Sequence, residues 1–133
     1  MHWLETTLAE LAAARPGRPT VEAAHSLVRE LGQRPGVLAV TAAHDGLPLA
    51  AAGQPDTTEA LAAIAQRATA EATAAAEPLH LGAPRQVLFV GATHKVAILC
   101  SGNLQIALLA AAETPLSEAL GSPPVPVPAR AIR

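Results

Sequence analysis

The amino-acid sequence predicts an α/β (α+β) domain, with a five-stranded antiparallel sheet that is covered by helices on both faces. Five short apolar runs are separated by turn residues, and stretches with helical spacing precede and interrupt them. The last three runs, at residues 86–92, 96–101 and 104–111, are joined by only two or three residues, which is too few for a parallel crossover. These runs do not alternate between apolar and polar residues, and continuous apolar strands are typical of a sheet covered on both faces.

Two helices are expected before the first strand. Leucines recur at helical spacing within residues 3–14, and the breaker RPGRP follows them. Thr20 is expected to cap a second helix, whose apolar stripe extends over residues 21–31 and whose stop signal is Gly32.

The first two strands are expected to form a hairpin over residues 37–43 and 47–52. The dipeptide between them, Asp45-Gly46, tolerates the positive φ angles that a two-residue hairpin turn requires. Pro48 cannot donate a ladder hydrogen bond, so the second strand is expected at an edge of the sheet.

A long, alanine-rich helix is predicted over residues 57–76. Asp56 and Glu59 are expected to cap its start in the manner of a capping box. Alanine has the highest helix propensity, but Leu61 and Ile64 are the only large apolar residues in this helix. The helix therefore suits close packing against a flat partner, either its own sheet or a second copy of the chain.

The domain organisation follows from these elements. Residues 1–19 are expected to form an N-terminal helix and linker, residues 20–120 the main domain, and residues 121–133 a flexible proline-rich tail. Within the main domain, residues 114–120 are expected to form a short last helix.

Composition and charge argue against several classes of function. Nine basic and eleven acidic residues give a net charge of −2, and aromatic residues make up 2% of the chain, so no nucleic-acid partner is expected. No uninterrupted apolar run approaches the roughly 18 residues that a membrane-spanning helix needs. A single cysteine, together with acidic residues where a signal peptide would be basic and then apolar, predicts a cytoplasmic protein.

The sequence offers no set of residues that predicts catalysis, a metal site or a cofactor. Its five histidines lack metal-ligand spacing, and no phosphate-binding G-x-x-x-x-G-K loop occurs. We interpret His44 and Asp45 as turn chemistry, because no third catalytic group accompanies them. Cys100 lies in an apolar run and is expected to be a buried, inert thiol.

Several segments follow one another in a characteristic order. They are Pro35-Gly36-Val37, Asp45–Ala50, the helix start Glu59–Ala63, Arg85–Val90, and the Gly102-containing hairpin into Leu104–Leu109. Their order and spacing, over about residues 20–112, resemble the Roadblock/dynein-light-chain family.

This resemblance implies a Roadblock/profilin-like fold and a regulator that is not an enzyme. Family members form homodimers or heterodimers by joining their sheets edge to edge. Their paired long helices then form a platform for Ras-like small GTPases. The bacterial members include the partner of the gliding-motility GTPase, which stimulates GTP hydrolysis without lending an arginine finger. The chain is thus expected to modulate the nucleotide cycle or the localisation of such a GTPase.

The open strand and the long helix supply the candidate interface residues. A strand as apolar as Val87–Val90 would invite aggregation at an edge, so we expect it to pair with its twin across a two-fold axis. Polar residues of the long helix are candidates for the rim of a partner interface. The full candidate set is Gln66, Arg67, Thr69, Glu71, Thr73, Val87, Leu88, Phe89 and Val90.

Two other functions remain open from the sequence. α/β folds also host ligand pockets, so an enzyme or small-molecule sensor would require a cleft with perturbed titratable groups. A structural scaffold would instead use the proline-rich tail to bind another protein.

Two features depart from the family pattern. Family members usually end in a long helix that packs on the sheet, whereas residues 115–120 allow less than two helical turns. The helix expected over residues 3–14 is additional. We infer that it covers the sheet face that the shortened end leaves bare.

Deletion of residues 1–14 should therefore lower the melting temperature by several degrees, because apolar surface of the sheet would become exposed. Thermal unfolding followed by circular dichroism measures the change. An unchanged melting curve would show that this segment does not cover the sheet.

Overall fold

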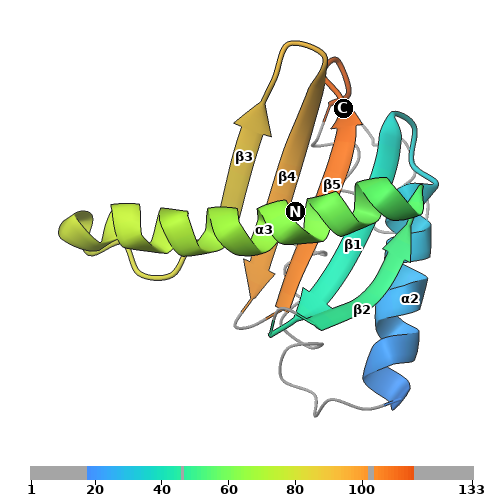
Figure 1. The fold of residues 1–133 in the computed structure, drawn as a ribbon, viewed down its shortest axis with the longest axis horizontal. Coiled ribbons are helices and arrows are strands. Elements are labelled where there is room, and N and C mark those ends of the chain that lie inside the picture. Colours follow the sequence, from blue (N-terminus) through green and yellow to red (C-terminus); the bar gives the residue numbers. More distant parts are fainter. Residues whose placement is uncertain (1–17, 46, 102–103, 116–133) are drawn as a thin grey trace, which may run out of the picture.

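The computed structural model describes residues 18–45, 47–101 and 104–115 (Figure 1). Its elements, in chain order, are α2 (Arg18–Gly32), β1 (Val37–His44), β2 (Leu47–Ala52), α3 (Pro55–Ala76), the 3₁₀ turn η1 (Glu77–Leu79), β3 (Gln86–Val90), β4 (His94–Ser101) and β5 (Leu104–Ala111).

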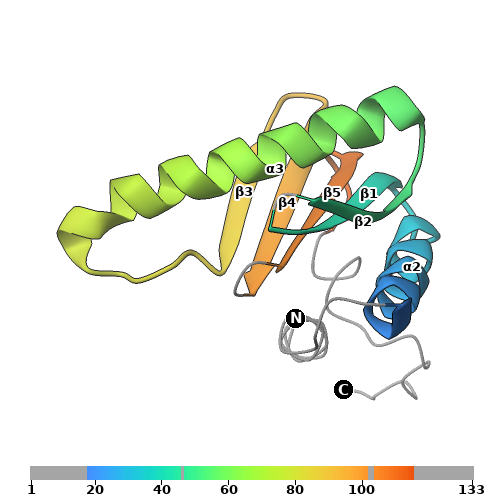
Figure 2. The same ribbon diagram turned by 60° about the horizontal axis from the view of Figure 1, so that its bottom comes forward.

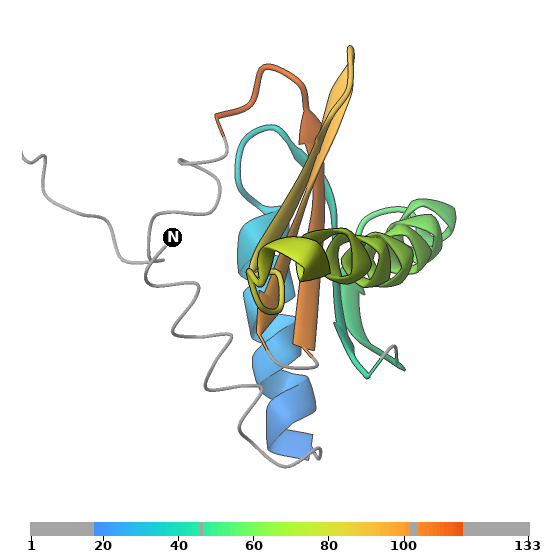
Figure 3. The same ribbon diagram turned by 90° about the vertical axis from the view of Figure 1, so that its left-hand side faces the viewer.

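The five strands form one antiparallel sheet in the order β2-β1-β5-β4-β3. α2 covers one face and α3 runs across the other, so the two helices lie on opposite sides of the sheet (Figures 1 and 3). The predicted fold is confirmed, and so is the prediction that β2, which contains Pro48, lies at an edge.

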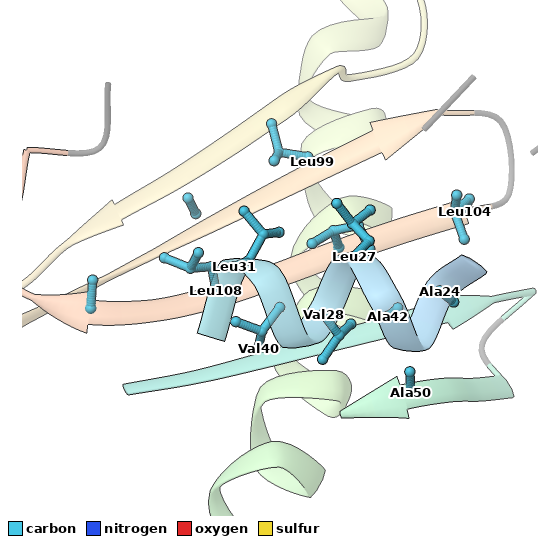
Figure 4. Packing of buried hydrophobic residues seen from close by; sticks show 13 residues of the cluster. Ala24, Leu27, Val28, Leu31, Val40, Ala42, Ala50, Leu99, Leu104 and Leu108 are labelled. Carbon is cyan, nitrogen blue, oxygen red and sulfur yellow. The ribbon is translucent and has the colours of Figure 1, made fainter. Parts of the chain in front are cut away.

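The larger hydrophobic core lies between α2 and the sheet (Figure 4). Leu27, Val28 and Leu31 of α2 pack in the same cluster as Val40 and Leu108 of the sheet, and all five are buried. Complete burial of side chains of this size contributes about 1.5–3 kcal/mol each. This face therefore holds most of the bulky apolar side chains.

β4 and β5 contribute alternately to two cores, which explains their continuous apolar sequences. Ile98 belongs to the cluster beneath α3, whereas its neighbour Leu99 belongs to the cluster beneath α2. Ala107 and Leu108 of β5 divide in the same way. The prediction that such strands are covered on both faces is confirmed for these two strands.

α3 packs on the opposite face mainly through small side chains. Leu61, Ala65 and Ala68 cluster with Ile98 and Ala107 of the sheet. Because two of these three helix positions hold the small side chain of alanine, the helix backbone can approach the strands closely. The expected close packing of this helix against its own sheet is therefore observed.

Two buried threonines hold the start of α3 above β1. Thr41 Oγ1 donates a hydrogen bond to the main-chain carbonyl of Thr58 at 3.2 Å. Thr58 Oγ1 in turn donates to the carbonyl of Pro55 at 3.0 Å. Both hydroxyls are satisfied, so their burial leaves no unpaired donor. Thr58 is thereby fixed over β1.

β1 and β2 pair in the register His44 to Leu47, as expected for the predicted hairpin. Asp45 adopts a left-handed conformation with φ of 52°, which matches the chemistry expected of an Asp-Gly turn. His44 Nδ1 lies 3.3 Å from Asp45 Oδ2, a contact between neighbours in the chain. The interpretation of this pair as part of a turn is consistent with its geometry.

The predicted capping of both helices is wrong. α2 begins at Arg18, so Thr20 lies inside its first turn. α3 begins at Pro55 after Gln54, and no side chain caps it, so Asp56 and Glu59 form no capping box. Proline at the first helical position has a preset φ and no N–H to satisfy, which favours a start slightly earlier than expected.

Strand boundaries differ from the prediction by about two residues at one turn. β3 ends at Val90 and β4 begins at His94, because the N–H of Gly91 donates to the His94 carbonyl at 2.8 Å. Of the helix and linker predicted over residues 1–19, residues 1–17 lie outside the described residues, and residues 18 and 19 belong to α2. The tail predicted over residues 121–133 also lies outside them. Of the last predicted helix, the structure describes only residues 114 and 115.

None of the helices in the described ranges is long and apolar enough to cross a membrane.

Candidate interaction surface

β3 is the second edge of the sheet and presents an unpaired backbone. Within the described part of the chain it pairs with β4 alone. The N–H of Cys100 donates to the carbonyl of Arg85, and the N–H of Gly91 donates to that of His94. Because hydrogen-bonding direction alternates along a strand, the main-chain groups of residues 86, 88 and 90 point away from β4. These groups are available to another strand.

The side chains of β3 are exposed on both faces of the sheet. Leu88 and Val90 lie opposite Ala97 and Lys95 and so point to the α2 side, where they are 46% and 70% exposed. Phe89 points to the α3 side and is 47% exposed. The prediction that both faces are covered is therefore wrong for β3, because neither helix covers its outer half.

α3 extends beyond this edge of the sheet. Ala68 is the last buried residue of the helix, and the following turns continue past β3 (Figures 1 and 2). Glu71 and Thr73 on these turns are exposed. The projecting end gives the helix a surface that its own sheet does not use.

A groove runs between α3 and the exposed end of β3. It encloses about 230 Å³ and is lined by Ile64, Arg67, Ala68, Glu71 and Phe89. Arg67 Nε donates to Glu71 Oε1 at 2.9 Å, one turn apart on the helix. An apolar floor thus lies beside an ion pair.

The structure brings only some of the predicted residues together. Arg67, Glu71 and Phe89 line the groove, and Leu88 and Val90 lie on the adjoining edge. The other four lie elsewhere. Gln66 and Thr73 are exposed on α3, Val87 is half-buried beneath the helix, and Thr69 faces the sheet.

Thr69, a candidate for the rim of a partner interface, instead faces its own sheet. Its Oγ1 lies 3.6 Å from Cys100 Sγ on β4. Thr73 Oγ1 donates back to the main-chain carbonyl of Thr69 at 2.8 Å. In an alanine-rich helix the sequence gives little indication of which face is buried, so Thr69 and Thr73 could not be separated.

Sequence reasoning also missed three apolar residues near this edge. Ile64 is 45% exposed on the groove, and Leu79 and Leu81 are about 70% exposed after α3. Their spacing resembles that of ordinary core residues. Leu79 and Leu81 lie between Pro78, which ends the helix, and Gly82, outside any long regular element. This position in the sequence could have identified them as exposed.

Cys100 is a free, half-buried thiol beneath α3. Burial raises its pKa above the ordinary value, and the contact with Thr69 lowers it by a smaller amount. Because the thiolate is the reactive form, the expected inert character agrees with this environment. In the described residues, no group of three His, Cys, Asp or Glu side chains could hold a metal ion.

These features define a three-layered α/β domain, with a helix on each face of the sheet, one open apolar edge strand and a helix that projects past it. The sequence profile of the Roadblock/LC7 domain matches residues 23–110. The chain belongs to the Roadblock/LC7 family.

Solved structures share the same fold. A Roadblock/LC7 domain from Streptomyces avermitilis aligns with a TM-score of 0.64 at 23% identity, over 71% of this chain and 82% of that one. The gliding protein MglB from Thermus thermophilus gives 0.66 at 19% identity, over 80% and 83%. Myxococcus xanthus MglB gives 0.58 at 14% identity, over 86% and 77%. No curated protein sequence matches the chain.

Alkylation of Cys100 in the folded protein should be slow at about pH 7.5 and should accelerate only at higher pH than in the unfolded chain, because burial raises its pKa. Thr69→Val should slow it further by removing the contact that lowers the pKa. Rates measured by mass spectrometry in native buffer and in denaturant test both statements. Equal rates in the two states would contradict them.

Proposed function

We propose that the chain is a non-enzymatic homodimeric regulator of a Ras-like small GTPase. It binds the GTPase through α3 in the cytoplasm and modulates its nucleotide cycle or its localisation. Membership of the Roadblock/LC7 family and the fold shared with two MglB gliding proteins support this proposal.

The observation that carries the dimer is the open, apolar β3 edge. Residues 86, 88 and 90 direct their main-chain groups outward, and a two-fold axis at Leu88 would satisfy them with the same groups of a second copy. Leu88 would then face its twin, and such apolar cross-strand pairs stabilise a sheet. The joined sheet would contain ten strands with no exposed β3 edge.

The surface proposed for the GTPase is the outer side of α3. Ala63, Ala70 and Ala74 are exposed there. Their short side chains leave the helix surface smooth, so that a flat partner can approach it closely. Gln66 and Thr73 add polar groups beside them. Two such helices, placed side by side in the dimer, would double this surface.

The role proposed is regulation without a catalytic residue from this chain. Hydrolysis would be modulated by positioning the GTPase rather than by supplying a reacting group. Arg67, the exposed arginine of α3, is already paired with Glu71, so it is not assigned as an arginine finger.

Wild-type protein should sediment at twice the chain mass at micromolar concentration, and Leu88→Pro should sediment as a monomer. Proline removes the outward N–H of residue 88 but no hydrogen bond to β4. Leu88→Ile, which retains that N–H, is the matched control. A monomeric wild type, or a Leu88→Pro variant that stays dimeric, would contradict pairing through β3.

The immobilised dimer should capture at least one Ras-like GTPase of its genome and should distinguish the GTP-bound from the GDP-bound form. The double variant Gln66→Arg/Thr73→Arg should weaken capture roughly tenfold or more, since added bulk and charge disrupt the helical surface. Ser26→Arg, on the exposed side of α2, is the control.

Equal and negligible binding of all these GTPases by an intact dimer would count against the proposal. Loss of binding in Ser26→Arg instead of the α3 variant would place the partner on the opposite helix.

A further inference from the structure

The Arg67–Glu71 ion pair lies on the side of α3 that borders the groove over Phe89. The two side chains are 84% and 68% exposed. An ion pair this accessible adds little to the stability of its own helix. Its position beside exposed apolar residues therefore calls for another explanation.

Pairing of β3 with a second copy about Leu88 fixes where the partner's helix passes. α3 crosses β3 near Val87, which packs beneath it. The two-fold rotation carries Val87 to the level of Phe89, about 7 Å along the strand. Packed helices lie about 8–10 Å apart, so the partner's α3 would run beside α3 and occupy the groove.

The position of the axis along α3 follows from the strand spacing. Thr58 is held above β1, and β3 is three strands further along the sheet. One strand spacing of about 4.8 Å corresponds to about three residues of a crossing helix. α3 thus crosses β3 at about residue 68, in agreement with the helix residues that line the groove together with Phe89. The two-fold axis lies midway between β3 and the β3 of the second copy, which is half a strand spacing beyond β3. At that distance along α3 the axis passes near Thr69, midway between Arg67 and Glu71.

We propose that Arg67 of each copy pairs with Glu71 of the other across this axis, and that the two pairs select a second copy of this chain as partner. The inference rests on the dimer of the proposed function. Helices related by a two-fold axis perpendicular to them run antiparallel. Arg67 therefore lies opposite the partner's Glu71, and Glu71 lies opposite the partner's Arg67. Ile64, Ala68 and Phe89 exclude water from one side of these charges, which strengthens attraction and penalises like charges.

The experiment separates pairing between chains from pairing within one chain. Arg67→Glu places four acidic groups around the axis of its homodimer, and Glu71→Arg places four basic groups there. Each variant alone should dimerise roughly tenfold more weakly than wild type at about 0.05 M salt. An equimolar mixture of the two should form mostly heterodimer, measured by native mass spectrometry with one isotopically labelled chain.

Glu59→Arg is the matched control, because it makes the same charge change on the same helix near the strand β1. Mixed with Arg67→Glu, it should show much less enrichment of heterodimer, and the enrichment seen with Glu71→Arg should fade at about 1 M salt. A dimeric wild type whose charge-reversed chains mix statistically would overturn this inference alone. A monomeric wild type would overturn the proposed dimer instead.

Discussion

One constraint governs the described structure: β3 is apolar on both faces, and no strand among residues 18–45, 47–101 and 104–115 pairs with its outer edge. Leu88 and Val90 are exposed on one face and Phe89 on the other, while the main-chain groups of residues 86, 88 and 90 point outward. Natural sheets usually protect an edge with charge, proline or a bulge. β2, the other edge, contains Pro48, and its register against β1 shifts at Ala42/Ala43, where Leu49 is skipped; β3 has neither device. A strand left in this state is suited to pairing.

The two helices cover different faces of the sheet and do so with side chains of different size. α2 places leucine and valine in the larger core and closes its face. α3 contributes one large buried side chain, Leu61, and otherwise alanine and threonine. Its attachment to its own sheet is correspondingly light, and its turns beyond Ala68 have little of the sheet beneath them. A second copy, paired through β3, would continue the sheet under these turns and complete their packing.

Much of the fold could be predicted from the sequence because its signals are local. The Asp-Gly turn, the short connections between the last strands and the continuous apolar run of Ile98 and Leu99 each report a nearby constraint. The start of α3 was misplaced because the helix begins at Pro55, whose preset φ and missing N–H suit the first helical position, and no side chain caps it. The groove could not be predicted, since its lining combines Phe89 of β3 with Ile64 and Arg67 of α3. This combination depends on where along the strands α3 crosses the sheet, and the spacing of alanines does not encode that position.

With so few charges, a small number of ionic groups would have a large share in the recognition of the proposed partner. Charged residues make up 15% of the chain, and on the described turns of α3 between Ala60 and Ala76 they are Arg67 and Glu71. Apolar contacts along β3 would favour association with many exposed strands, because backbone pairing carries little sequence information. Charges placed beside the same edge discriminate among partners, since a mismatched approach brings like charges together. Affinity and specificity would thus come from adjacent but chemically different parts of one surface: the strand supplies the first and the helix the second.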